Sequence, residues 1–317
     1  MSKYRSALPQ RRGAFLTDGG METSLIFNDG LELPHFASFV LLGSTTGRDR
    51  LKAYYRPYLE TARTQGAGFV LDSATWRANP DWGDRLGYDA GALHAANVAA
   101  IDLLVELRDE WETEAMPCVI SGAIGPRGDG YKAGHMTAPE AEDYHRTQIT
   151  SFAGTAADMV TAFTLSTIDE AVGIARAARS LDMPCVISFT VETDGRLADG
   201  TPLRHAIEAT DLATEASPAY YMINCAHPSH FEGALHAKEA WVQRIQGIRA
   251  NASTLSHAEL DEAETLDAGD PNDLAKRYHQ LRQSFPDIRI LGGCCGTDHR
   301  HVAAIAAACM PFAATPV

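Results

Sequence analysis

Two adjacent cysteines, Cys294 and Cys295, lie between glycines in the stretch GGCCGT at residues 292–297. Neighbouring cysteines rarely pair with each other, because the eight-membered disulfide ring strains the peptide. An adjacent pair is more useful when both sulfurs must contact the same bound group. A third cysteine, Cys225, ends the apolar run YYMINC, which is typical of a buried strand. These three sulfurs are the residues of the chain best suited to chemistry.

Three thiolates at one point would suit Zn²⁺, which binds cysteine sulfur at about 2.3 Å and prefers four ligands. Three protein ligands leave the fourth position open, as in catalytic zinc sites. Such a site activates water poorly, but it would hold a substrate thiol as the anion near neutral pH, although a free thiol has a pKa of about 8.5. The chemistry that follows is alkyl transfer to sulfur. The CxxC spacing of zinc fingers is absent, so the three cysteines must meet in space.

Short apolar runs that alternate with helical patterns could bring these cysteines together. Eight runs are predicted to be strands, at residues 14–18, 68–73, 117–123, 157–163, 184–190, 220–225, 242–251 and 288–293. This alternation predicts one α/β domain over residues 1–317, a single (β/α)8 barrel, with a doubly wound open sheet as the alternative. The carboxyl ends of barrel strands share one rim, where Cys225 would meet the 294–295 pair.

The glycines around the adjacent cysteines have a predicted role of their own. Two neighbours on a regular strand point to opposite faces of the sheet. We therefore expect Gly292, Gly293 and Gly296 to let the backbone turn sharply, so that both sulfurs face the rim.

The composition and net charge of the chain limit the kinds of partner that it could bind. The 317 residues are 45% hydrophobic and 21% charged, as in a globular protein with a sizeable core. The formal charge of −14 argues against nucleic acid as a partner. We find no apolar run long enough to cross a membrane and no secretory signal, and six scattered cysteines do not resemble a disulfide framework. We therefore expect a cytoplasmic protein, with Cys118, Cys185 and Cys309 packed in its core.

Four motifs together resemble the homocysteine S-methyltransferases, and they occur in order: DGGMET at 18–23, GAIGPRGDGY at 122–131, INCAHP at 223–228 and GGCCGT at 292–297. The combination of INC with GGCCGT is the most specific part. The resemblance implies a zinc-dependent (β/α)8 barrel enzyme that methylates the thiol of homocysteine, giving methionine. Its expected cofactor is Zn²⁺, held by Cys225, Cys294 and Cys295. Its expected partners are a small thiol acceptor and a cationic donor such as S-methylmethionine, S-adenosylmethionine or a betaine.

The resemblance also implies where the substrate binds. Residues just after the first, second and sixth strands match substrate-binding positions of the family, and these are Asp18, Gly19, Thr75, Trp76 and Asn224. A cationic donor would also favour aromatic faces, and Trp76 and Tyr131 lie on the loops after the second and third strands.

One position departs from the family pattern. The fourth strand of the family ends in Glu-Thr, and that glutamate binds the amino group of the substrate, whereas this chain has Phe163 before Thr164. A phenyl ring cannot neutralise an ammonium group by ion pairing. Glu192, just past the fifth strand, is the predicted substitute. A different small thiol as acceptor is the alternative.

Two other functions are also consistent with the sequence. A zinc–thiolate protein could bind small thiols without turnover, and a redox protein could use a Cys294–Cys295 disulfide. The acidic segment at residues 256–271 is predicted to be a solvated helix and loop that lies near the rim and could form a lid.

Overall fold

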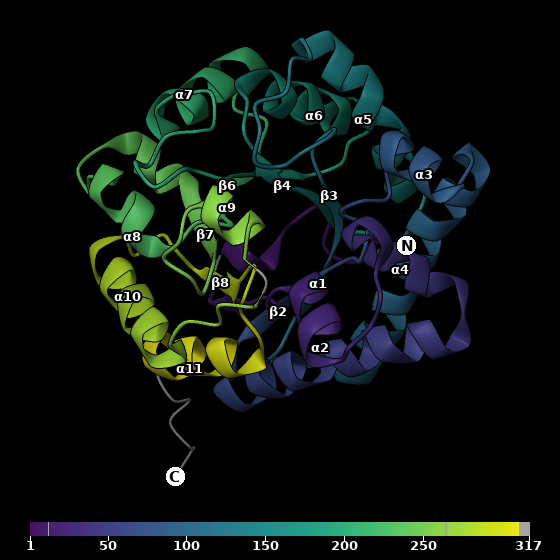
Figure 1. Cartoon of the computed structure of the whole chain (residues 1–317), viewed down its shortest axis with the longest axis horizontal. Helices are drawn as coiled ribbons and strands as arrows, with labels where there is room; N and C mark the ends of the chain where they lie inside the picture. Colours follow the sequence, from purple (N-terminus) through teal and green to yellow (C-terminus); the bar gives the residue numbers. More distant parts are fainter. Residues whose placement is uncertain (12, 264, 311–317) are drawn as a thin grey trace.

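The first and last strands of the chain pair with each other and close the sheet into a barrel (Figure 1). The computed structural model describes residues 1–11, 13–263 and 265–310. All eight strands are parallel and pair in chain order, as β1 (Phe15–Leu16), β2 (Gly68–Asp72), β3 (Cys118–Ile124), β4 (Met159–Leu165), β5 (Cys185–Phe189), β6 (Tyr220–Asn224), β7 (Ile245–Ala250) and β8 (Ile290–Gly293). The predicted (β/α)8 barrel is confirmed, and the open-sheet alternative is wrong.

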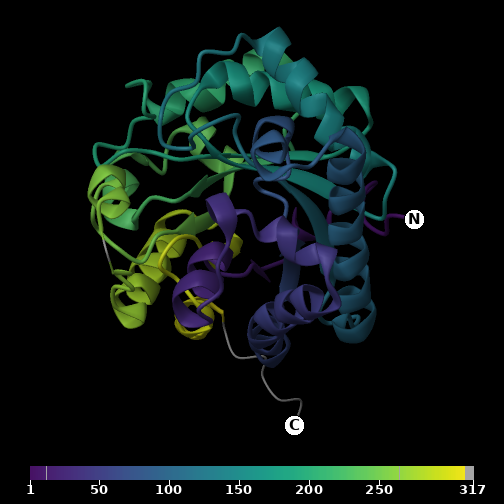
Figure 2. The ribbon, with the colours of Figure 1, turned by 45° about the vertical axis from the view of Figure 1, so that its right-hand side comes forward.

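Helices surround the barrel (Figure 2). They are α1 (Met21–Thr23), α2 (Thr45–Gln65), α3 (Pro80–Leu86), α4 (Ala90–Trp111), α5 (Ala138–Ala153), α6 (Ile168–Ser180), α7 (Leu203–Thr214), α8 (Pro228–Phe231), α9 (His257–Asp261), α10 (Pro271–Ser284) and α11 (His299–Cys309). Local signals set several of their ends. Ser44 caps α2, which ends at Gly66 in the left-handed conformation. Thr137 and Glu140 form the predicted capping box of α5.

Helix α4 is long and apolar enough to cross a membrane by length and composition, the one such helix in the described ranges. A helix that packs on the core of a globular protein passes the same test, and α4 packs against the outer side of the sheet. Leu103, Leu104 and Leu107 belong to the core between the helices and the sheet. The apolar composition of α4 therefore has a structural explanation in this fold.

The interior of the barrel has a separate core, built by alternate residues of the strands. Val70, Met159 and Met222 belong to this cluster, together with Phe15, Val119, Val186, Tyr220 and Ile290. Because side chains alternate along a strand, the residues two positions further on also face the interior, nearer the carboxyl ends. On β2, β6 and β7 this layer contains Asp72, Asn224 and Arg249. Polar groups thus replace apolar ones toward the rim.

All eight predicted strands differ from the observed strands by one to three residues at one or both ends, among them the first and the seventh. The first covers only Phe15–Leu16. The seventh begins at Ile245 because residues Ala240–Arg244 form a 3-10 helix instead. Arg244 anchors that turn by an ion pair with Asp211 on α7, 2.8 Å between Nε and Oδ2.

Candidate metal centre

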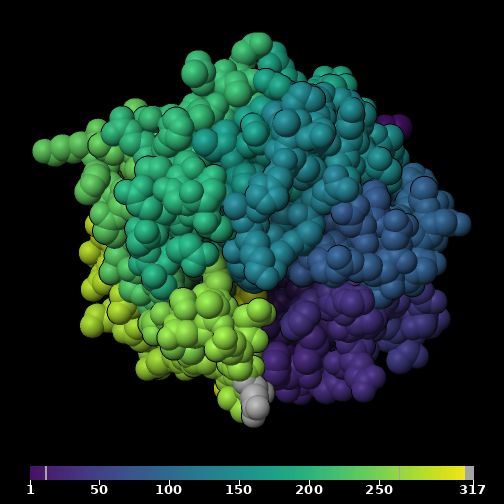
Figure 3. All heavy atoms as spheres, turned by 45° about the horizontal axis from the view of Figure 1, so that its top comes forward, coloured from purple at the N-terminus to yellow at the C-terminus, as the bar shows by residue number. Residues whose placement is uncertain are grey.

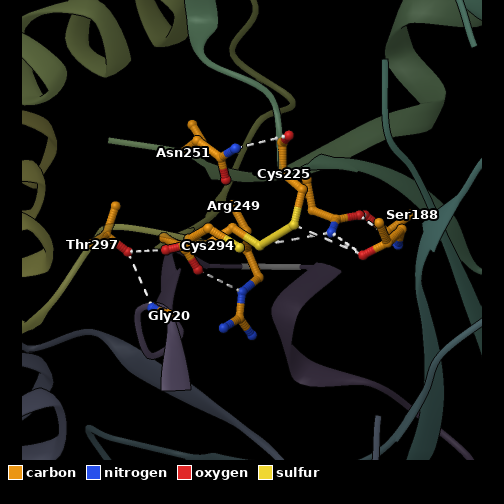
Figure 4. The surroundings of a disulfide bond; sticks show 12 residues. Gly20, Ser188, Cys225, Arg249, Asn251, Cys294 and Thr297 are labelled. Carbon is orange, nitrogen blue, oxygen red and sulfur yellow. Dashed lines mark hydrogen bonds between the residues drawn. A yellow bond between two sulfur atoms is a disulfide. The ribbon is translucent and has the colours of Figure 1, made fainter. Parts of the chain in front are cut away.

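Three cysteine sulfurs meet at the carboxyl ends of β6 and β8. Cys225 follows β6 and the adjacent pair follows β8, and all three Sγ atoms lie within 4.8 Å of one another. The structure joins Cys225 to Cys294 by a disulfide (Figure 4). The thiol of Cys295 is free. The alternative of a Cys294–Cys295 disulfide is therefore wrong. Sulfurs that are distant in sequence nevertheless meet at one point, as the zinc hypothesis requires.

The donor set fits a zinc ion once the disulfide is reduced. Sulfurs bound at about 2.3 Å around a tetrahedral ion lie roughly 3.8 Å apart, so a set already within 4.8 Å needs only small shifts. Three thiolates leave one position open for a ligand from the adjoining cavity. Cys225, Cys294 and Cys295 would hold the ion. The disulfide prevents this, because neither of its sulfurs is a thiolate.

Each of the three sulfurs has its own polar neighbour. The Thr164 hydroxyl is 3.8 Å from the Cys225 sulfur, and Asn224 Nδ2 donates to the Cys294 sulfur at 3.9 Å. The Tyr131 hydroxyl lies 3.7 Å from the sulfur of Cys295. Burial raises the pKa of the Cys295 thiol, and the contact with Tyr131 acts in the opposite direction. Polar neighbours of this kind would stabilise negative charge on the sulfurs.

The backbone at these positions departs from regular strand geometry. Cys225 has a φ of 54° and Thr164 one of 61°, both left-handed, a conformation that non-glycine residues hold only when their surroundings enforce it. The Cys225 carbonyl is fixed by Asn251 Nδ2 at 3.0 Å and His257 Nε2 at 2.6 Å. These donors hold the turn that directs the sulfur of Cys225 into the site.

The predicted role of the glycines needs correction. Of the three, only Gly296 has a left-handed φ, at 77°. Gly292 and Gly293 end β8 and are needed for close packing instead. A Cβ at Gly292 would overlap the Thr17 hydroxyl, and one at Gly293 would overlap the Thr297 hydroxyl. Here glycine provides space rather than a turn.

A cavity of about 670 Å³ adjoins the sulfurs, and most of the predicted substrate residues line it. They are Asp18, Gly19, Trp76, Tyr131 and Asn224. Phe163, the position at which the chain departs from the family pattern, lines the cavity as well. Cys225, Cys294 and Cys295 belong to the same wall.

Two predicted substrate residues do not line the cavity. Thr75 is fully buried, and its hydroxyl donates to the Ala123 carbonyl at 2.7 Å, which ties the loop after β2 to β3. Glu192 stands behind His257, 3.2 Å from its Nδ1, outside the cavity wall. The prediction that Glu192 replaces the missing glutamate is therefore not supported, because another side chain separates it from the site.

The structure adds an ion-pair network that the sequence reasoning missed. Arg249, at the end of β7, reaches Asp72 at 2.7 Å and Asp18 at 2.6 Å, and all three side chains are nearly buried. Burial raises the pKa of Asp72 to about 6 although Arg249 acts against it, and burial also raises the pKa of Asp18. The available signal was a charged residue within an apolar strand, as in GFVLD and IQGIRA.

The mouth of the cavity lies between two segments that are distant in sequence. Phe27 and Phe36, both about half exposed, line it on the N-terminal side, and α9 with the loop after it lines the other. Figure 3 shows these purple and yellow-green segments beside each other. The predicted helix at residues 256–271 thus exists as α9, and residue 264 lies outside the described residues.

The remaining cysteines and the histidines near the motifs do not join the metal centre. Cys118, Cys185 and Cys309 are free and buried, as predicted, and burial raises the pKa of the first two thiols to about 12. His227 caps α8 and His301 belongs to the capping box of α11, so their roles are structural.

A parallel barrel with three converging sulfurs beside a cavity at the carboxyl ends of its strands has the layout of a (β/α)8 enzyme with a metal site. The sequence pattern of the homocysteine S-methyltransferase family matches residues 15–309, so the chain belongs to this family and is a methyltransferase. It is 25% identical over 277 residues to the homocysteine S-methyltransferase of Escherichia coli K12, covering 80% of this chain and 81% of that one. It is 22% identical to homocysteine S-methyltransferase 4 of Zea mays, covering 96% and 92%.

Solved structures show the same fold. The oxidised form of the homocysteine methyltransferase MmuM from Escherichia coli superposes with a TM-score of 0.75 at 21% identity, covering 96% of this chain and 99% of that one. The metallated form of MmuM gives 0.72 at 21% identity, covering 95% and 98%. At 21% identity, the similarity to MmuM shows that the two proteins share the barrel fold.

Proposed function

We propose that the chain transfers a methyl group from a cationic donor to the thiol of homocysteine, giving methionine, with Zn²⁺ held by Cys225, Cys294 and Cys295. The observation that carries this proposal is the meeting of three sulfurs beside one cavity. Membership of the family and the names of the relatives support homocysteine as the acceptor. The metallated form of MmuM supports a metal at such a site.

The proposed reaction is a single displacement at carbon. Zinc, when bound, would favour the thiolate form of the acceptor near neutral pH, so the thiol proton leaves before the methyl group moves. The acceptor sulfur then forms the new S–CH3 bond. The carbon–heteroatom bond of the donor breaks in line with it, and its electron pair stays on the donor sulfur or nitrogen, which becomes neutral. No proton moves in this step, so the protein contributes mainly by positioning the two substrates.

The charge of the cavity favours a cationic donor. Six carboxylates line it, and they are Asp18, Glu22, Asp72, Asp129, Asp261 and Asp267, against two guanidinium groups, those of Arg77 and Arg249. The predicted aromatic attraction is weaker at Trp76, because Arg77 already stacks on that ring at 4.3 Å and on Trp82 at 3.7 Å. The carboxylates therefore supply most of the attraction for a donor cation.

The test uses the full chain, reduced and supplied with zinc. Homocysteine is mixed in turn with S-methylmethionine, S-adenosylmethionine and glycine betaine, and methionine is measured by mass spectrometry. We expect methionine from at least one donor. Cys295→Ala should lose both bound zinc and methionine formation, because two sulfurs hold the ion too weakly. Cys309→Ala, which removes a buried thiol of α11, is the matched control and should keep both.

Two results would contradict the proposal. One is methionine formation by a Cys295→Ala protein that elemental analysis shows to be free of metal. The other is binding of homocysteine without methionine from any of the three donors, which would indicate a thiol-binding protein without turnover.

A further inference from the structure

The cavity lacks a carboxylate at the place where the family pattern has one. The Phe163 ring lines the wall there, and the Arg249 guanidinium carbon lies 5.1 Å from the centre of that ring. The Phe163 ring has no charge to pair with the ammonium group of an amino acid, and its face already contacts the buried Arg249 cation. The acceptor must therefore be recognised by another carboxylate, or its amino group is not recognised at all.

Asp72 has a free acceptor atom in the right region. Asp72 is 5% exposed and lines the cavity, and its Oδ2 accepts a hydrogen bond from Arg249 Nη1 at 2.7 Å. Its other oxygen, Oδ1, is buried and accepts no hydrogen bond from the described residues. The Ser121 hydroxyl interacts with the Asp72 carboxylate and acts to lower the pKa of Asp72, and its hydrogen bond with the Thr161 hydroxyl, at 2.8 Å, can run in either direction. Buried carboxylate oxygens normally have partners, so Oδ1 is suited to receive one from a ligand.

Two of the neighbouring charged groups, Asp18 and Arg249, already have partners. Asp18 accepts a hydrogen bond from the Tyr54 hydroxyl at 2.9 Å and pairs with Arg249 through its other oxygen. Arg249 donates to the Gly293 and Gly19 carbonyls, each at 3.0 Å, in addition to its two carboxylate partners. The guanidinium group therefore positions Asp72 and has little capacity left to bind a carboxylate of the substrate.

The excess of carboxylates over cations around Arg249 also favours the binding of a cation. When both are ionised, Asp18 and Asp72 carry two negative charges, and Arg249, which pairs with both, supplies one positive charge. Glu22, which accepts a hydrogen bond from the Ser38 hydroxyl at 2.7 Å, adds a further carboxylate to the same wall. Buried charge without a counterion is costly, and an ammonium group from a ligand would balance it.

We propose that Asp72, positioned by Arg249, binds the ammonium group of the acceptor in place of the missing glutamate. The inference rests on the proposed methyl transfer and defines its acceptor as a short thiol with an ammonium group. A thiol of the same length that carries only a carboxylate would be a poor acceptor, because it leaves Asp72 Oδ1 without a partner.

Homocysteine and 4-mercaptobutyrate, which lacks only the amino group, test this inference. The reduced, zinc-loaded chain is assayed with both acceptors and whichever donor is active, and kcat/KM is compared. The native chain should prefer homocysteine by at least about 10-fold. Asp72→Asn should lose most of that preference through a higher KM for homocysteine, with little change for 4-mercaptobutyrate. Glu192→Gln, which alters the carboxylate behind His257, should keep the preference.

Other outcomes would overturn the inference. Equal use of both acceptors by the native chain would show that the amino group is not recognised, and so would an unchanged preference in Asp72→Asn. If Asp72→Asn does not fold, Asp72→Glu replaces it. The shifted carboxylate should raise KM for homocysteine alone, and an unaltered KM would reject the role of Asp72.

Calorimetric titration of the same zinc-loaded protein with the two thiols gives the ratio of their Kd values without any methyl donor. Tighter binding of homocysteine supports the inference even if no donor is active, a result that would reject only the proposed methyl transfer. Equal Kd values for the two thiols reject the inference.

Discussion

At the scale of single residues, the site combines chemistry visible in sequence with neighbours that only the fold supplies. The three cysteines could be predicted because few other roles suit a glycine-flanked pair near a strand end. Their polar partners could not, since Thr164, Asn224 and Tyr131 come from three different strand ends. The same limit of prediction from sequence applies to Glu192 and Asp72. Both are acids near the rim, but only the barrel geometry decides which one lines the cavity.

Tyr131 offers a test of these neighbours. Its hydroxyl is 3.7 Å from the Cys295 sulfur, and its ring packs against His257 at 4.3 Å between centroids. Tyr131→Phe keeps the ring and removes the hydroxyl. We expect a loss of about 10-fold to 100-fold in zinc affinity or kcat, as is usual for polar groups around metal ligands. Chelator competition measures the first and steady-state methionine formation the second. Unchanged values for both would mean that the hydroxyl does not act on the sulfur.

Tyr144 provides the matched control for this substitution. Its hydroxyl donates to Asn79 at 2.9 Å, away from the three sulfurs. Tyr144→Phe should therefore leave the affinity for zinc as it is in the native chain.

At the scale of elements, short strands and well-capped helices hold the site in place. Eight strands could be predicted because apolar runs and helix caps are local signals. Their ends could not, because they depend on tertiary contacts. Residues Ala240–Arg244 are apolar enough for a strand, but Arg244 pairs with Asp211 and the segment turns as a 3-10 helix. Helix α11 begins at His299, four residues after Cys295, and is capped by Asp298.

The cap of α11 permits a prediction of pH dependence. Asp298 accepts from the Arg300 backbone at 2.9 Å and forms an ion pair with the Arg300 side chain at 2.6 Å. Burial raises the pKa of Asp298, but the hydrogen bonds outweigh it and lower the pKa from 3.8 to about 2. Because the pKa is lower in the folded state, this stabilisation is complete above about pH 4 and is lost as the pH falls toward 2.

Asp298→Ala should reduce the free energy of unfolding by about 1 kcal/mol at pH 7, as is typical of a lost helix cap. The difference from the native chain should shrink as the pH is lowered from 4 toward 2. Urea unfolding followed by circular dichroism measures both. Asp109→Asn, at an exposed position of α4, should change the free energy little at either pH. A constant difference across this range would show that the charge of Asp298 is not what stabilises the cap.

At the scale of the whole molecule, closure of the barrel brings the ends of the chain to one site. β1 pairs with β8, so Asp18 near the N-terminus and the 294–295 pair share one wall of the cavity. This convergence follows from the strand order. The family motifs at both ends of the chain could therefore predict residues of one common site. The redox state was not foreseeable from sequence, because pairing depends on distances between sulfurs and not on their order. The structure pairs Cys225 with Cys294, whose Cα atoms are 5.3 Å apart.

Because the ligands come from two distant strands, zinc should bind the folded chain far better than the unfolded one. Binding at 1,000 times Kd stabilises a protein by about 4 kcal/mol, less any affinity of the unfolded chain. At about 1.5 °C per kcal/mol for a chain of 317 residues, the reduced protein should melt roughly 6 °C higher with zinc than with a chelator. The oxidised protein should show no such shift, since two of the three sulfurs are bonded to each other. Scanning calorimetry in both redox states measures the effect, and an equal shift in the oxidised protein would place the metal elsewhere.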